Sequence, residues 1–209
     1  MAKITLVESV NQTLEQEMRR DDTIVLLGED VGVDGGVFRV TKDLINKFPE
    51  RVFDTPLAES GIIGASIGIA LNGLKPIPEI QFAAFMSYAY PHIQSHAARI
   101  RSRTRGSFNC PMVIRTPYGG GIKALEHHSE SMEALYAHIP GLKVIMPSSP
   151  YNAKGLLISA IRDPDPVIFL EPKRVYRAIK EEVPEEDYSI EIGKANIIQE
   201  GSDVTVISW

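Results

Sequence analysis

The sequence predicts an α/β protein in which a doubly wound, mostly parallel sheet carries helices on both faces. Short continuous apolar runs, typical of parallel strands covered on both faces, alternate with longer segments of helical pattern. With 209 residues, of which 44% are apolar and 23% charged, the chain can bury a substantial core. The expected strands are Ile24–Gly28, Pro76–Phe82, Met112–Thr116, Leu142–Met146 and Val167–Leu170, and the expected helices are Leu6–Arg20, Thr41–Phe48, the segment from Glu59 to Asn72, Ala83–Arg103 and Pro150–Arg162.

Two of these helices have clear start signals. Thr5 and Glu8 have the spacing of a capping box, and apolar residues then recur at one-turn intervals over residues 6–20. Ser149 followed by Pro150 is an N-cap with proline at the first helical position. Both signals predict helices that begin at defined residues.

The stretch from Asp54 to Gly73 is unusual because its only charged residue after Asp54 is Glu59. It contains three glycines in a helical pattern, and each costs about 1 kcal/mol relative to alanine. We therefore expect close approach of another backbone or a ligand, and a buried helix. Glu59 would lie in the first turn, where the helix dipole favours an acid, so it either caps the helix or serves a site.

Composition excludes several classes of function. The net charge of −5 argues against nucleic acid as a main partner. No apolar run is long enough to cross a membrane, and residues 1–5 lack a signal core, so we expect a cytoplasmic protein or one processed into a matrix. The single cysteine, Cys110, is expected to be a buried structural thiol. An acidic run at Glu181–Asp187 predicts a solvated connector.

Residues able to do chemistry follow the predicted strands, where ligands bind in open α/β sheets. They are acids, aromatic residues and neighbouring histidines, and no zinc-protease or hydrolase motif accompanies them. His128 is either an acid–base catalyst or an ordinary loop residue. The candidates are Glu29, Glu59, Gln81 to Phe85, Tyr118 to Gly121 and His127-His128.

Long motifs covering residues 3–209 resemble the beta subunits of the thiamin-dependent 2-oxo acid dehydrogenases. These proteins are the decarboxylating first components of the pyruvate and branched-chain 2-oxo acid dehydrogenase complexes. The similar motifs include Gly28-Glu-Asp-Val31, Arg51-Val-Phe-Asp-Thr-Pro-Leu-Ala-Glu-Ser-Gly61, Pro78-Glu-Ile-Gln-Phe82, His128-Ser129 and Pro140-Gly-Leu-Lys-Val144. The resemblance implies a transketolase-type pyrimidine-binding domain at residues 1–180. Residues 181–209 would then be a connector and, from Asp203 to Trp209, the first strand of a C-terminal domain.

The resemblance also implies roles for individual residues. Glu59 would hydrogen-bond N1′ of the thiamin diphosphate aminopyrimidine, and His128 would hand on protons when the acyl group passes to lipoamide. The cofactor-binding set would be Glu29, which also joins a proton relay between active sites, with Leu57, Glu59, Gln81 and the ring of Phe85. A structural potassium ion would be held by main-chain oxygens of Met112, Ala160, Ile161, Asp163 and Asp165.

The chain lacks the Gly-Asp-Gly motif with which thiamin diphosphate enzymes bind Mg²⁺ and the diphosphate. The resemblance therefore implies an alpha subunit that supplies those groups, in an α₂β₂ heterotetramer served by the lipoyl acyltransferase core of a complex. Two alternatives stay open: the equivalent domain of another transketolase-type enzyme, and a non-catalytic α/β binding domain. The substrate, pyruvate or a branched-chain 2-oxo acid, is also open.

Overall fold

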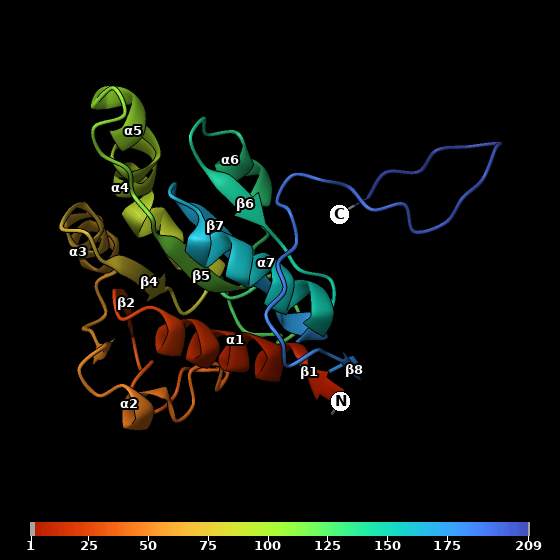
Figure 1. Ribbon diagram of the computed structural model, residues 1–209, viewed down its shortest axis with the longest axis horizontal. Helices are drawn as coiled ribbons and strands as arrows, with labels where there is room; N and C mark the ends of the chain where they lie inside the picture. Colours follow the sequence, from red (N-terminus) through yellow and green to blue (C-terminus); the bar gives the residue numbers. More distant parts are fainter. Residues whose placement is uncertain (1–2, 209) are drawn as a thin grey trace.

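A computed structural model describes residues 3–208 and confirms the predicted α/β fold (Figure 1). Six strands form one sheet in the order β3-β2-β4-β5-β7-β6, and every neighbouring pair is parallel. The loops that follow the strands therefore meet at one edge of the sheet. All five expected strands form, and β3 extends the sheet; the strands are β2 (Ile24–Gly28), β3 (Val52–Asp54), β4 (Lys75–Glu79), β5 (Val113–Tyr118), β6 (Lys143–Ile145) and β7 (Val167–Pro172).

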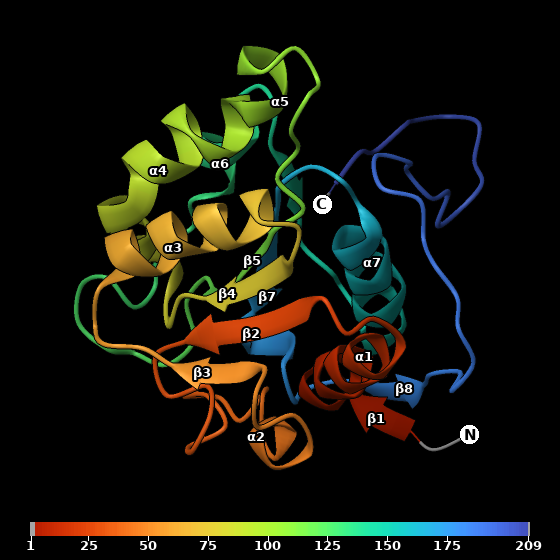
Figure 2. The same ribbon diagram turned by 60° about the vertical axis from the view of Figure 1, so that its left-hand side comes forward.

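Helices cover both faces of the sheet (Figure 2). α1 (Leu6–Arg20) and α7 (Pro150–Arg162) pack together on one face, around a core that includes Leu157. α3 (Glu59–Leu71) and the segments after β4 cover the other face, around Ile63. No helix among residues 3–208 has the length and apolar character needed to span a membrane. The other helical segments are α2 (Leu44–Lys47), η1 (Ala83–Ala89), α4 (Tyr90–Ser95), η2 (Ala97–Arg99), α5 (Ile100–Arg103), α6 (Glu133–Ala137) and η3 (Lys173–Val175).

Both predicted helix starts are confirmed. The Thr5 hydroxyl accepts a hydrogen bond from the Glu8 N–H at 3.3 Å, and the Glu8 carboxylate accepts one from the Thr5 N–H at 2.7 Å. Ser149 accepts from the Asn152 N–H at 3.3 Å, with Pro150 as the first helical residue. These caps satisfy N–H groups that have no partner within the helix, so they fix where α1 and α7 begin.

The single helix expected over Ala83–Arg103 is wrong in detail, because the segment divides into η1, α4, η2 and α5. Pro91 lies in the first turn of α4, where its missing N–H costs nothing, but it cannot continue a preceding helix. A second break falls at His96. The candidate residue Phe85 therefore lies on the short 3₁₀ segment η1, which is separated from the end of β4 at Glu79 by residues Ile80–Phe82.

The expectation that α3 is buried is wrong for one of its faces. Ile63 and Ile67 are buried, whereas Gly61 and Gly68 are exposed. A Cβ added to Gly68 would meet no atom within 4 Å. Residues seven apart lie on the same side of a helix, and among residues 3–208 a Cβ at Gly61 would meet only Ala58 Cβ, at 3.7 Å. The side of α3 that carries Gly61 and Gly68 is therefore largely open in the isolated chain.

The predicted solvated connector begins with a strand that the sequence did not indicate. β8 (Lys180–Glu182) pairs antiparallel with β1 (Lys3–Thr5) in a separate two-stranded sheet. The first residues of the run Glu181–Asp187 therefore belong to the folded body. The charged side chains of this run gave no sign of a strand, because β8 pairs with β1 through backbone hydrogen bonds. Whether it pairs depends only on where β1 lies.

The strand expected over Asp203–Trp209 does not form in residues 203–208, and Trp209 lies outside the described residues. Val204 and Val206 are exposed, at 78% and 82%. An apolar run becomes a strand only where a neighbouring edge accepts its backbone hydrogen bonds, and these residues pair with no strand of the described part of the chain. Figure 1 shows the end of the chain as part of a loop that projects from the folded body.

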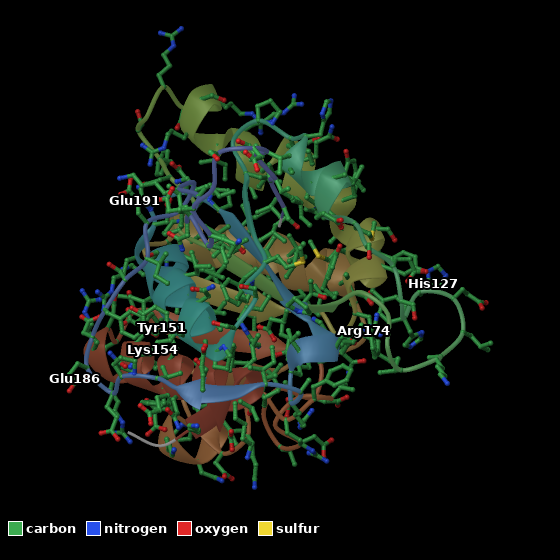
Figure 3. The ribbon with its side chains drawn as sticks, turned by 90° about the vertical axis from the view of Figure 1, so that its right-hand side faces the viewer. His127, Tyr151, Lys154, Arg174, Glu186 and Glu191 are labelled. Atoms are coloured by element: carbon green, nitrogen blue, oxygen red, sulfur yellow. The ribbon has the colours of Figure 1, made fainter. Side chains whose placement is uncertain are left out.

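Residues 183–192 lie along α7 and are attached to it. Lys154 Nζ donates a hydrogen bond to the main-chain oxygen of Glu185 at 3.0 Å, and the Ile190 N–H donates to the Gly155 oxygen at 3.1 Å. Figure 3 shows Lys154 and Glu186 on the side where this segment crosses the helix. The segment is thus a docked strap whose path is fixed by α7.

Gly155→Ala is expected to release this strap from α7. A Cβ at position 155 would lie 2.6 Å from Ile190 Cγ1 and 2.9 Å from Tyr188 Cε2, so the strap must move. Limited chymotrypsin digestion should then cut after Tyr188 faster than in the wild type. Gly68→Ala, which meets no neighbour within 4 Å, is the control and should leave the digestion unchanged. Equal protection in both variants would contradict the docking.

Candidate active site

The carboxyl edge of the sheet brings the predicted cofactor residues together. Glu29 follows β2, Glu59 opens α3 after β3, and Gln81 and Phe85 follow β4. Because these strands are neighbours in the order β3-β2-β4, the residues come from three adjacent loops. Leu57 lies in the β3–α3 loop of the same edge and is 80% exposed.

Glu29 is a buried acid without a partner. It is 3% exposed, and neither carboxylate oxygen has a hydrogen bond among the described residues. The pKa of Glu29 is raised to about 7: burial is the largest cause, the charges of Glu59 and Asp30 add to it, and the Ala58 N–H, which forms no hydrogen bond of normal geometry, lowers it in part. Glu29 can therefore change its protonation state near neutral pH.

Glu59 is the first residue of α3 and is half-buried. Within residues 3–208 no hydrogen bond or ion pair reaches its carboxylate, and α3 has no side-chain cap. The capping interpretation is therefore limited to the field of the helix dipole. Glu59 lies close enough to Glu29 to raise the pKa of that group, and its own carboxylate is available to hydrogen-bond a bound group.

An aromatic cluster adjoins the two acids. The ring of Phe85 lies 6.0 Å from Phe82 and 5.4 Å from His128, both edge to face, and Phe82 lies 4.4 Å from His128. Gln81 Nε2 donates to Asp30 Oδ2 at 2.8 Å, which links the loops after β4 and β2. The structure thus joins His128 to the predicted pyrimidine-side residues.

His128 lies on the loop 119–132, which leaves the carboxyl end of β5. Its Nδ1 is 2.9 Å from the main-chain oxygen of Glu126, and a carbonyl can only accept, so Nδ1 carries a proton. The neutral ring then has its lone pair on Nε2. Figure 3 shows neighbouring His127 on this loop, which projects from the same side of the molecule as Arg174.

Glu29→Gln should remove a pH-dependent part of the chain's stability. The pKa of Glu29 is about 7 in the folded chain, whereas an ordinary glutamate has a pKa of 4.5. Between these two pH values Glu29 therefore keeps its proton in the folded chain and loses it in the unfolded chain. Wild-type stability therefore falls across this window as pH rises, while the neutral variant is spared this loss. In urea denaturation of the full-length chain alone, the wild type and Glu29→Gln should have similar midpoints near pH 4.5. At about pH 8 the midpoint of the variant should be the higher one. A constant difference at both pH values would contradict the assignment.

A buried charge network lies in the sheet beneath this edge. Arg115 on β5 donates from Nε to Glu171 Oε1 at 2.7 Å and from Nη1 to Glu79 Oε2 at 2.9 Å. Tyr176 donates its hydroxyl to Glu171 at 2.6 Å, and all four side chains are at most 4% exposed. Burial raises the pKa of Glu79. The positive charge of Arg115 acts against this rise, and the negative charge of Glu171 adds to it.

Sequence reasoning missed this network, although a signal was present. Glu79, Arg115 and Glu171 each interrupt or end an apolar run expected to be a buried strand. A charge in such a position requires a partner, because a lone buried charge is strongly unfavourable. Only the strand order shows that the three belong together, since they come from positions up to 92 residues apart (79 to 171).

The residues of the predicted potassium site lie at the opposite, amino edge, where β5 and β7 begin. The Met112 oxygen accepts the Val167 N–H at 2.9 Å, and the Ala160 oxygen accepts the Asp163 N–H at 3.2 Å. Arg101 Nε contacts Asp165 Oδ1 at 2.6 Å. Ile161 is buried beside them on α7. The five residues are close neighbours, and the potassium ion stays a prediction.

The sequence matches a known family over most of its length. Residues 2–179 match the family described as "Transketolase, pyrimidine binding domain". A solved structure described as "Split gene transketolase, inactive beta4 tetramer" superposes with a TM-score of 0.64, 22% identity, and coverage of 81% of this chain and 51% of that chain. This likeness supports the fold.

Curated relatives share more sequence. The chain is 60% identical to the pyruvate dehydrogenase E1 component subunit beta of Acholeplasma laidlawii and 51% identical to the 2-oxoisovalerate dehydrogenase subunit beta of Bacillus subtilis. Each alignment covers 100% of this chain and 64% of the relative, so the chain spans less than two thirds of their length. With its six-stranded parallel sheet and a family match over residues 2–179, the chain belongs to the transketolase pyrimidine-binding domain family.

Proposed function

We propose that this chain is the pyrimidine-binding part of the beta subunit of a thiamin diphosphate-dependent 2-oxo acid dehydrogenase. The enzyme would decarboxylate pyruvate or a branched-chain 2-oxo acid and pass the acyl group to lipoamide. The observation that carries the proposal is the pair of neighbouring acids at the carboxyl edge, Glu29 and Glu59, neither of which has a hydrogen-bond partner for its carboxylate in the described part of the chain. The names of the two curated relatives support the same reaction class.

The site has the polar groups that a bound aminopyrimidine requires. Both Glu29 oxygens and the Thr55 hydroxyl are buried without hydrogen bonds among the described residues, and a protein rarely leaves such groups unsatisfied unless a ligand or water meets them. The Phe85 ring, which contacts His128, offers an apolar face on the segment after the neighbouring strand β4. These residues fit thiamin diphosphate, which supplies the electron sink for decarboxylation when bound.

The residues of this chain then have distinct tasks. Glu59 would hold and exchange a proton at the pyrimidine, and Glu29, whose pKa is about 7, would receive or return that proton. Phe85 would orient the ring by contact, with Leu57 and Gln81 beside it. His128 would move a proton through Nε2 during acyl transfer.

The remaining parts of the enzyme are proposed to come from other chains. An alpha subunit would supply the Mg²⁺ and diphosphate site and cover exposed groups such as Leu57, in an α₂β₂ heterotetramer. The lipoyl acyltransferase core would be the further partner. We propose residues 1–180 as the pyrimidine-binding domain and 181–209 as the connector to a C-terminal domain, in a protein of the cytoplasm or of a matrix after processing.

Calorimetry and kinetics test this proposal. The full-length chain assembled with its alpha partner should bind thiamin diphosphate and turn over either pyruvate or 3-methyl-2-oxobutanoate, and the ratio of the two kcat/KM values would identify the substrate. Absence of binding with the partner present would favour the non-catalytic α/β domain. A full-length chain carrying its own Gly-Asp-Gly motif would favour the single-chain transketolase-type enzyme.

A further inference from the structure

One lysine attaches the histidine loop to the body of the protein. Lys173 begins η3, directly after β7, so its side chain starts from the carboxyl edge of the sheet. Its Nζ donates a hydrogen bond to the main-chain oxygen of His128. The same Nζ lies 4.9 Å from the centroid of the Phe82 ring. The ammonium group therefore contacts both the loop and the aromatic cluster on which the His128 ring rests.

The hydrogen bonds inside the loop organise it but do not attach it. Glu130 accepts the N–H groups of His127 at 2.7 Å and Ser129 at 3.0 Å, and all three belong to the loop 119–132. Among residues 3–208, the Lys173 bond is the only hydrogen bond that joins residues 120–129 to a residue outside this loop. Met132 packs against the core at one end of the loop, whereas residues 120–129 are held on the body mainly by Lys173 and by ring contacts of the two histidines.

The environment of Lys173 suits a positioning role. The side chain is half-buried and forms no ion pair within the described residues, so its charge is not compensated by a directly bonded acid. Burial lowers its pKa, and Glu130 opposes this from a distance. The face of the Phe82 ring and the carbonyl of His128 together stabilise the ammonium charge in place of an acid. A lysine on the solvated surface would be stabilised by water and would not need these contacts.

We infer that Lys173 is a positioning residue that clamps the loop 119–132 onto Phe82 and so fixes His128 Nε2 for proton transfer during acyl transfer to lipoamide. This inference rests on the proposed function. Lys173 touches neither the reacting atoms nor the pyrimidine-side acids, so it should affect the lipoyl step through His128 and leave the earlier decarboxylation nearly intact.

Kinetics of the assembled full-length enzyme test the inference. Lys173→Met keeps most of the unbranched apolar side chain but removes the terminal ammonium group, and with it the donors and the charge. Misplacement of a catalytic group by about 1 Å can cost about 10²-fold, so we expect acyl transfer to a lipoyl domain to slow by about 10- to 100-fold. Decarboxylation with ferricyanide as the electron acceptor should change far less. Lys173→Arg keeps the charge and should recover part of the loss, and Lys123→Met removes an exposed, unbonded lysine of the same loop as the control.

A double-mutant cycle decides whether Lys173 acts through His128. If it does, Lys173→Met should add little to the loss already caused by His128→Gln. Losses that multiply, or equal losses in both assays, would overturn the inference.

Hydrogen exchange tests the clamp independently of the proposed function, which would fail if the wild-type enzyme were inactive in both assays. Lys173→Met should speed the exchange of amides 120–130, and Lys123→Met should not. Unchanged exchange in Lys173→Met would refute the clamp itself.

Discussion

Glu59→Gln in the full-length chain, assembled with its alpha partner, is expected to lower turnover of the 2-oxo acid by about 10²- to 10⁴-fold, the range of a lost general acid–base group. The amide keeps the size and can still hydrogen-bond, but it cannot exchange a proton. Binding of thiamin diphosphate, measured by calorimetry, should persist because Phe85 and the other residues lining the site are unchanged. A steady-state assay on enzyme saturated with cofactor isolates the chemical step.

Glu50→Gln is a matched control for that experiment, since Glu50 is an exposed acid in the turn before β3. It should retain wild-type turnover. Normal turnover of Glu59→Gln with cofactor bound would show that Glu59 only stabilises the start of α3. A loss of turnover confined to weaker cofactor binding would assign it a binding role instead.

Arg115→Met should cost about 3–5 kcal/mol of unfolding free energy, because breaking a buried pair leaves uncompensated charge in the core. Arg115 is 0% exposed and bonds to two carboxylates, Glu79 and Glu171, with Tyr176 as a further donor to Glu171. Methionine fills much of the space but satisfies neither acid. Urea denaturation of the full-length chain measures the change.

The loss should shrink as pH is lowered from about 7 to 5, because carboxyl groups buried without a cation have raised pKa values and are accommodated best when protonated. Adding Glu79→Gln and Glu171→Gln to Arg115→Met should recover part of the stability. Arg99→Met, at an exposed arginine without an ion pair in the described chain, should change stability by less than about 0.5 kcal/mol. A triple variant less stable than Arg115→Met would contradict the charge argument.

Local signals in the sequence predicted the elements whose formation depends on neighbours in the chain. The capping box of Thr5 and Glu8 and the Ser149-Pro150 start are satisfied within one helical turn. The apolar runs at β2 and β7 identify buried strands by composition alone. Their alternation with helices fixes a parallel sheet, because the connections must cross over.

The same signals failed where the outcome depends on a distant partner. The strand expected after Asp203 had a suitable run but no edge to pair with in the described chain, whereas Lys180–Glu182 had only charges and paired because β1 lies beside it. The open face of α3 was likewise beyond the sequence. Three glycines predicted a close approach, but only the structure shows that His92 lies near Gly64 while Gly68 has no neighbour within 4 Å among residues 3–208.

The candidate site divides in the same way. The sequence by itself determined which residues follow which strands, and its motifs pointed to Glu59 and His128. Only the tertiary structure decided that Glu29 is buried without a hydrogen-bond partner among residues 3–208. It also decided that Arg115 pairs with acids from β4 and β7, and that Lys173 reaches the His128 loop. Each of these depends on strand order and burial, which bring together side chains far apart in the chain and set their electrostatic environment.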